Sequence, residues 1–190
     1  MARLGMVIDT RRCVGCMDCV VACKTENGTP EGMNRDWITY ATRGKFPNLS
    51  LTIQSERCNH CDNPPCVDNC PTGALSKRID GIVTLEQDRC VGCKYCTWSC
   101  PYGAPQFNPE ERVMGKCDMC ADYVDQGKNP SCVDACPMRA LEFGDYDELI
   151  DRHGEPDQVY PQPDDSITRP SICVRGHAKA IFRTIAGERG

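Results

Sequence analysis

The stretches RCVGCMDCVVACK (residues 12–24) and RCVGCKYCTWSCP (residues 89–101) decide how this chain of 190 residues folds. Each contains four cysteines with the spacing C-x2-C-x2-C-x3-C, and each begins with RCVGC. Two other stretches share a second motif: NPPCVDNCPTGAL (63–75) and NPSCVDACPMRAL (129–141) are identical at nine of thirteen positions. The chain therefore contains an internal duplication with two alternating kinds of cysteine run.

Sixteen of the seventeen cysteines fall into four runs, and only Cys173 lies outside them. Run one is Cys13, Cys16, Cys19 and Cys23; run two is Cys58, Cys61, Cys66 and Cys70; run three is Cys90, Cys93, Cys96 and Cys100; run four is Cys117, Cys120, Cys132 and Cys136.

The composition limits the classes of protein to consider. Cysteine makes up about 9% of the chain and aromatic residues only 6%, so we expect cysteine chemistry to hold the fold together. The odd cysteine count and the absence of an apolar signal segment near the N-terminus argue against a secreted disulfide framework. No stretch approaches the roughly 18 apolar residues of a membrane span. A net charge of −5 disfavours nucleic acid as a partner.

The spacing favours iron–sulfur clusters over zinc. Structural zinc sites draw on ligand pairs held far apart in sequence, whereas here three cysteines crowd together and a fourth follows shortly after. A loop with this spacing presents three thiolates to one [4Fe–4S] cluster, and the fourth cysteine binds the neighbouring cluster. We therefore expect four [4Fe–4S] clusters. We also expect a short helix to begin at each fourth cysteine, where a following proline suits the first turn.

Sharing of ligands forces the runs to work in pairs, but the spacing leaves the pairing open. Runs one and two could pair, with runs three and four forming the other pair. If instead runs two and three pair, as do runs one and four, the ligand sets are Cys58, Cys61, Cys66, Cys100; Cys90, Cys93, Cys96, Cys70; Cys13, Cys16, Cys19, Cys136; and Cys117, Cys120, Cys132, Cys23.

The rest of the chain gives weaker signals. LGMVI (4–8) and GIVTL (81–85) predict short strands, and DYDELIDRHG (145–154) predicts a helix capped by aspartate and ended by glycine. The Pro-rich stretch 155–170 predicts irregular structure. We expect His60 to lie near iron or at the surface without binding it, and Lys24 to place a positive charge beside a cluster. No nucleophile–base constellation is visible, so we expect no catalytic site in this chain.

Several of these stretches together carry a family resemblance. CNHCDNPPCVDNCPTGAL, CVGCKYCTWSCPYGAPQFN, KCDMCADYVDQGKNPSCVDACPMRALEFG and the tail DELIDRHG…TRPSICV resemble the iron–sulfur, electron-transfer (B) subunits of the molybdopterin oxidoreductases, the dimethyl sulfoxide reductase family. The resemblance covers about residues 4–175. It implies an α+β fold with two ferredoxin-like domains, which favours pairing run two with three and run one with four.

The resemblance also implies a division of the chain and a set of partners. Residues 1–57 and 102–144 would form an outer ferredoxin-like domain, residues 58–101 an inner one, and residues 145–190 an irregular docking arm. The expected partners are a catalytic subunit that carries a molybdenum bis-pterin guanine dinucleotide cofactor and a membrane anchor subunit that oxidises quinol. The complex is expected at the cytoplasmic membrane, on the outer face after export with a twin-arginine partner. The alternatives are a formate-dehydrogenase-like beta subunit and a free polyferredoxin.

Overall fold

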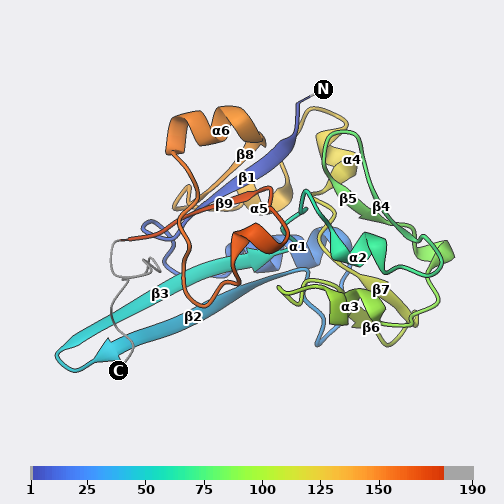
Figure 1. Ribbon diagram of the computed structural model, residues 1–190, viewed down its shortest axis with the longest axis horizontal. Helices are drawn as coiled ribbons and strands as arrows, with labels where there is room; N and C mark the ends of the chain where they lie inside the picture. Colours follow the sequence, from blue (N-terminus) through green and yellow to red (C-terminus); the bar gives the residue numbers. More distant parts are fainter. Residues whose placement is uncertain (1, 178–190) are drawn as a thin grey trace.

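The computed structural model describes residues 2–177, in which short helices and small sheets surround the cysteine runs (Figure 1). The fold is α+β, as predicted. The strands are β1 (Leu4–Asp9), β2 (Asp36–Lys45), β3 (Asn48–Arg57), β4 (Leu75–Lys77), β5 (Val83–Leu85), β6 (Gln106–Asn108), β7 (Val113–Gly115), β8 (Leu141–Asp145) and β9 (Ile172–Arg175). The helices are α1 (Asp18–Asn27), α2 (Pro65–Asp68), α3 (Tyr95–Ser99), α4 (Ala121–Val124), α5 (Ser131–Asp134) and α6 (Tyr146–His153), with the 3-10 turns η1 (Gln87–Arg89) and η2 (Asp165–Ile167).

A three-stranded sheet of order β8-β1-β9 joins the two ends of the described chain. Its central strand β1 is antiparallel to β8 and parallel to β9. Met6, Val7 and Ile8 are all buried, as expected for a central strand covered on both faces. The prediction of a strand over residues 4–8 is therefore confirmed, and β5 lies within the second predicted strand.

The C-terminal segment differs from the expected irregular arm. Asp145 caps α6 by accepting hydrogen bonds from the backbone N–H groups of Asp147 and Glu148, and the helix ends before Gly154, as predicted. Residues 155–170 are mostly irregular and contain η2. Strand β9, however, is part of the β8-β1-β9 sheet, so this part of the chain belongs to the core. The remainder of the predicted arm, 178–190, lies outside the described residues.

The long hairpin of β2 and β3 was not predicted. Its strands pair along ten positions, from Asp36 opposite Arg57 to Lys45 opposite Asn48, and it extends away from the rest of the molecule (Figure 1). Its tip is exposed, whereas its base is buried: Asp36 and Arg57 are both 2% exposed. The hairpin therefore brings a charged pair from its base into the interior.

The helices of the cysteine runs are placed differently from the prediction. Helices α1, α2, α3 and α5 contain the third cysteine of each run and do not begin at the fourth. In runs two, three and four, proline follows the fourth cysteine and the helix ends before that cysteine, because a proline one residue further on disfavours helical backbone there. Run one has Lys24 in place of proline, and α1 continues through Cys23 to Asn27.

Contacts between helices join the runs in two pairs. Helix α1 of run one packs against α5 of run four, and α2 of run two packs against α3 of run three. The hairpins β4-β5 and β6-β7 lie beside α2 and α3 (Figure 1). This arrangement agrees with the second-with-third and first-with-fourth pairing. The exact domain boundaries stay a prediction.

No helix within residues 2–177 is both long and apolar enough to cross a membrane.

Candidate metal centres

Three cavities are each lined by four cysteines from two different runs. We name them site 1, site 2 and site 4, and each also has apolar lining residues. The cysteines are Cys13, Cys16, Cys19 and Cys136 in site 1; Cys23, Cys117, Cys120 and Cys132 in site 2; and Cys70, Cys90, Cys93 and Cys96 in site 4.

The remaining four cysteines of the runs also lie close to one another, and we name them site 3. They are Cys58, Cys61, Cys66 and Cys100. Burial raises the pKa of Cys66 to about 12, and the neighbouring thiols of Cys58, Cys100 and Cys61 raise it as well. Burial likewise raises the pKa of Cys61 to about 12, with Cys58 and Cys100 contributing. The structure thus brings together all sixteen cysteines of the runs in four groups of four.

Several of the buried thiols are poor nucleophiles and weak acids on their own. Burial, followed by the charge of Asp36, raises the pKa of Cys23 to about 12, and burial raises that of Cys96 to about 11. At neutral pH such thiols stay protonated unless a bound cation stabilises the thiolate. Within residues 2–177, no three His, Cys, Asp or Glu side chains converge on a point that a single metal ion could occupy.

Backbone N–H groups point at the sulfur atoms in several of the sites. The N–H of Ala140 donates to Cys136 Sγ at 3.3 Å, and the N–H of Met119 donates to Cys117 Sγ at 3.4 Å. The N–H of Met114 donates to Cys90 Sγ at 3.4 Å. Such bonds stabilise negative charge on sulfur and are typical of iron–sulfur sites. Four thiols, an apolar wall and N–H donors therefore fit a [4Fe–4S] cluster.

The glycine of each RCVGC motif has a positive φ, and a side chain there would meet neighbouring atoms. Gly15 has φ +71° and Gly92 has φ +66°, in the left-handed region. A Cβ on Gly92 would clash with the carbonyl oxygen of Arg112, and a Cβ on Gly15 would lie 2.6 Å from the hydroxyl of Tyr40. The motif thus combines a positive φ with close packing beside the first two cysteines of the run.

We expect Gly92→Ala to destabilise site 4 strongly, because the new Cβ meets backbone that cannot move aside. Gly103→Ala is the matched control: Gly103 has a similar φ of +64°, but nothing lies within 4 Å of its Cβ position. The control should cost about 1 kcal/mol of unfolding free energy, and Gly92→Ala clearly more. Thermal unfolding with an iron assay measures both. Equal effects would show that the close approach to Arg112 is unimportant.

The four sites follow one another in space. Sγ of Cys19 in site 1 lies 3.5 Å from the hydroxyl of Ser55. This hydroxyl accepts a hydrogen bond from Arg57, which also donates to Cys132 of site 2. Desolvation raises the pKa of Cys117 in site 2, and Asp118, Cys23 and the nearby Cys58 of site 3 add to the rise. Sites 3 and 4 share one hydrophobic cluster, which contains Cys66 and Cys96. The order is therefore site 1, site 2, site 3, site 4.

Solvent reaches the sites at the two ends of this series. Of the sixteen cysteines, only Cys16 of site 1 and Cys93 of site 4 are exposed. Exposed apolar side chains lie next to both: Val14 is 56% exposed beside site 1, and Val91 is 67% exposed beside site 4. Sites 2 and 3 have only buried or partly buried cysteines.

Two expected neighbours of the sites have roles that the sequence did not give. His60 is fully buried, and its Nδ1 accepts a hydrogen bond from the N–H of Val83 at 3.0 Å, so it is not a surface residue. Lys24 donates through Nζ to the carbonyl oxygens of Met33 (2.6 Å) and Pro30 (3.3 Å). The charge of Lys24 therefore serves to hold the loop after α1.

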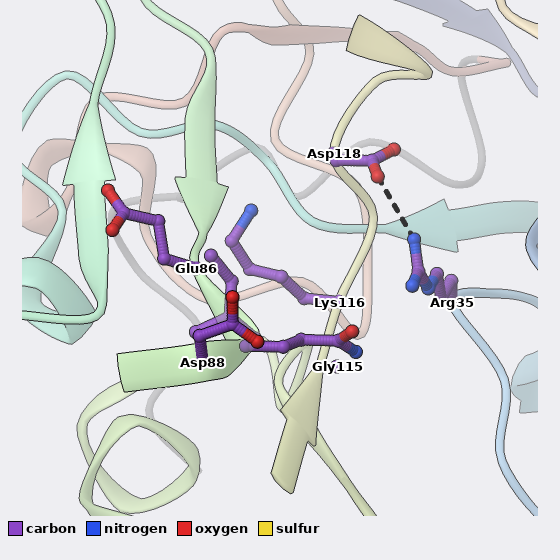
Figure 2. A pocket seen from close by; sticks show the side chains of 8 residues that line it. Arg35, Glu86, Asp88, Gly115, Lys116 and Asp118 are labelled. Atoms are coloured by element: carbon purple, nitrogen blue, oxygen red, sulfur yellow. Dashed lines mark hydrogen bonds and ion pairs between the residues drawn. The ribbon is translucent and has the colours of Figure 1, made fainter. Parts of the chain in front are cut away.

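Another cavity, of about 390 Å³, has no cysteine in its lining (Figure 2). It shares Asp118 with the lining of site 2. Arg35 and Asp118 form an ion pair at 3.0 Å on one wall, and the carboxylates of Glu86 and Asp88 lie on the other side. Lys116 also lines it, but its Nζ donates to the carbonyl oxygens of Val83 and Cys117. Arg35, Asp118 and Lys116 are thus paired with one another or with backbone, and Glu86 pairs with Arg89, which does not line the cavity.

Sequence reasoning missed Arg57, which lies outside the runs and donates a hydrogen bond to a cysteine of site 2. It is the last residue of β3, and its Nη1 donates to Cys132 Sγ at 2.8 Å. One signal was present: a basic residue precedes the first cysteine of every run, namely Arg12, Arg57, Arg89 and Lys116. The sequence does not reveal that two of these are exposed and two are buried.

Comparisons with known proteins agree with this geometry. Two matches to families described as "4Fe-4S dicluster domain" cover residues 49–146 and 7–74. The B subunit of anaerobic dimethyl sulfoxide reductase from Escherichia coli is 44% identical over 93% of this chain and 90% of its own length. Thiosulfate reductase electron transfer subunit PhsB of Salmonella typhi is 42% identical over 83% of this chain and 84% of its own.

A third relative has a different substrate in its name. Arsenate respiratory reductase iron-sulfur subunit ArrB of Shewanella is 36% identical over 84% of this chain and 92% of its own length. All three relatives are named as chains or subunits of reductases, while their named substrates differ. The chain belongs to the family of 4Fe-4S dicluster iron–sulfur subunits of the molybdopterin oxidoreductases.

Proposed function

We propose that this chain is the electron-transfer subunit of an anaerobic respiratory reductase and that the cysteines of sites 1 to 4 each hold one [4Fe–4S] cluster. In this proposal the chain has no catalytic site of its own. It relays electrons between a membrane anchor subunit that oxidises quinol and a catalytic subunit that carries a molybdenum bis-pterin guanine dinucleotide cofactor. The family assignment and the four groups of cysteines support it.

The observation that carries the proposal is the series of four sites with one exposed cysteine at each end. Each cluster, when bound, supplies a centre that gains and loses one electron at a time. The residues around sites 2 and 3 keep water away from the middle of the series, whereas Cys16 and Cys93 bring its ends to the surface. A relay needs this arrangement, because electrons must enter at one surface and leave at another.

The surfaces at the two ends also support docking of partners. Trp98 of α3 is 76% exposed, and Tyr95 is 50% exposed. The centroids of their rings lie 5.6 Å apart. At the other end, beside site 1, lie Val14, which is 56% exposed, and Met17, which is 46% exposed. Exposed apolar side chains gathered around a site are typical of protein interfaces.

We place the complex at the cytoplasmic membrane, on its outer face after export with a twin-arginine partner.

We expect about sixteen irons and about sixteen acid-labile sulfides per chain when the protein is purified without oxygen from cells that express the neighbouring subunits. Size-exclusion chromatography of the same sample should place the chain in a complex that also contains molybdenum. Iron well below this value would contradict the cluster count. A chain that elutes alone with its full iron would favour a free polyferredoxin, and a partner with formate dehydrogenase activity would favour the beta-subunit alternative.

A further inference from the structure

Arg57 is a permanent charge in the interior, between two of the sites. Its side chain is 1% exposed, and arginine does not lose its proton inside proteins. Burying such a charge is costly unless it is paired and hydrogen-bonded. Asp36, its cross-strand neighbour at the base of the hairpin, pairs with this charge at 3.0 Å from Nη2 to Oδ2, while Nε of Arg57 has no hydrogen-bond partner among the described residues.

The remaining contacts of this pair reach sulfur atoms of two different sites. Nη1 of Arg57 donates to Cys132 Sγ of site 2 at 2.8 Å, and Nη2 donates to the hydroxyl of Ser55. That hydroxyl donates to Asp36 Oδ1 at 3.1 Å and lies 3.5 Å from Cys19 Sγ of site 1. A continuous polar network thus runs from Cys19 through Ser55, Asp36 and Arg57 to Cys132.

This polar network is electrostatically asymmetric. Site 2 receives an N–H bond from the guanidinium itself, whereas site 1 is linked to the pair only through a neutral hydroxyl, which donates to the carboxylate and accepts from the guanidinium. A positive charge next to a cluster favours its more negative, reduced form, and a negative charge disfavours it. In a buried setting these effects are screened little by solvent.

We infer that the Asp36–Arg57 ion pair is a built-in device that raises the reduction potential at site 2 relative to that at site 1. The inference rests on the proposed presence of clusters at these sites. The pair then determines on which of two adjacent centres an electron resides. The basic residue at the same place before run one, Arg12, is exposed to solvent and has no such effect.

The test compares two variants that differ only in the charge of residue 57. Asp36→Asn leaves the guanidinium without its counter-charge, and Asp36→Asn/Arg57→Gln removes both charges, so no buried ion is left unpaired. Both are purified as the iron-loaded complex with co-expressed partner subunits, and potentials are measured by redox titration followed by electron paramagnetic resonance. The signal of site 2 is assigned by its loss in Cys132→Ser, and that of site 1 by its loss in Cys19→Ser.

We expect Asp36→Asn to shift the potentials of sites 1 and 2 upward. The double variant should then shift site 2 downward relative to Asp36→Asn, by more than any change at sites 3 and 4. Arg57→Lys, which keeps the charge, should stay near the wild-type value. Arg78→Gln, which removes a cation from an ion pair near the surface with Asp125, should leave all four potentials unchanged.

The inference is wrong if the reduction potential of site 2 is the same in the double variant as in Asp36→Asn. It is also wrong if the potentials of all four sites shift together. If the double variant does not assemble, Asp36→Asn alone decides, since an unchanged or lowered potential at both sites contradicts the inference. Iron content is measured in every sample. Low iron in the wild type would disprove the proposed clusters, whereas full iron with unmoved potentials would disprove only the role of the pair.

Discussion

Cys23→Ser and Cys132→Ser should each abolish the same spectroscopic signal, although the two residues lie in different runs. Both line site 2, together with Cys117 and Cys120. If this site holds one [4Fe–4S] cluster, loss of either ligand should remove about four of about sixteen irons per chain, or leave an altered cluster with one iron fewer. Iron assays and electron paramagnetic resonance of the two reduced variants measure this.

Cys173 supplies the matched control. It is fully buried in β9, packs with Val7 and Leu149, and lies in none of the four sites. Its thiol lies 3.6 Å from the carbonyl oxygen of Gly154. Cys173→Ala should therefore keep full iron and lose only about 1 kcal/mol of unfolding free energy, from the small cavity that it leaves.

The result also separates the two ways of pairing the runs. If runs one and two formed a pair, Cys23→Ser would remove the signal that Cys58→Ser removes, and Cys132→Ser would remove a different one. Two distinct signals lost in Cys23→Ser and Cys132→Ser would therefore contradict site 2 as described. Iron loss in Cys173→Ala would show that the seventeenth cysteine had been misassigned.

Three of the four cysteines in each group could be predicted because the information is local, whereas the fourth depended on the pairing of the runs, which spacing left open and only the family resemblance favoured. Three of the four cysteines in each site come from one run, so spacing alone places them around one centre.

The residues at which the helices begin could not be predicted from the sequence in the same way. Met17 and Lys94 have φ near +68° and +67° and precede α1 and α3, so the helix begins before the third cysteine. Neither methionine nor lysine is a residue type that predicts a left-handed conformation.

The long-range features could not be read from local patterns. The basic residues before the first cysteines are equivalent in sequence, yet Arg89 is exposed and Arg57 is buried. The difference arises because β3 leads into run two from the base of a hairpin whose other strand supplies Asp36. Similarly, nothing in residues 172–175 indicates that they form a strand parallel to β1, since that pairing depends on residues far away in sequence.

Removal of iron should unfold most of this protein. The main hydrophobic cluster includes Cys19, Cys132 and Cys136, so the walls of sites 1 and 2 are also the core of the molecule. Structural metal sites contribute on the order of 10 kcal/mol each, and the whole stability of a typical domain is about 5–15 kcal/mol. Loss of the four proposed clusters would therefore exceed what the remaining packing can supply.

The experiment uses the full chain, treated without oxygen with a strong iron chelator and examined by near-ultraviolet circular dichroism and limited proteolysis. We expect the near-ultraviolet signal to collapse and cleavage to appear in α1, which contains part of run one, and in β3, which leads into run two. Iron and sulfide added back under reducing conditions should restore both, and chelator already saturated with iron is the control. An iron-free chain that keeps its spectrum and unfolds in one cooperative transition would contradict the coupling, because its core would then be stable without the metal.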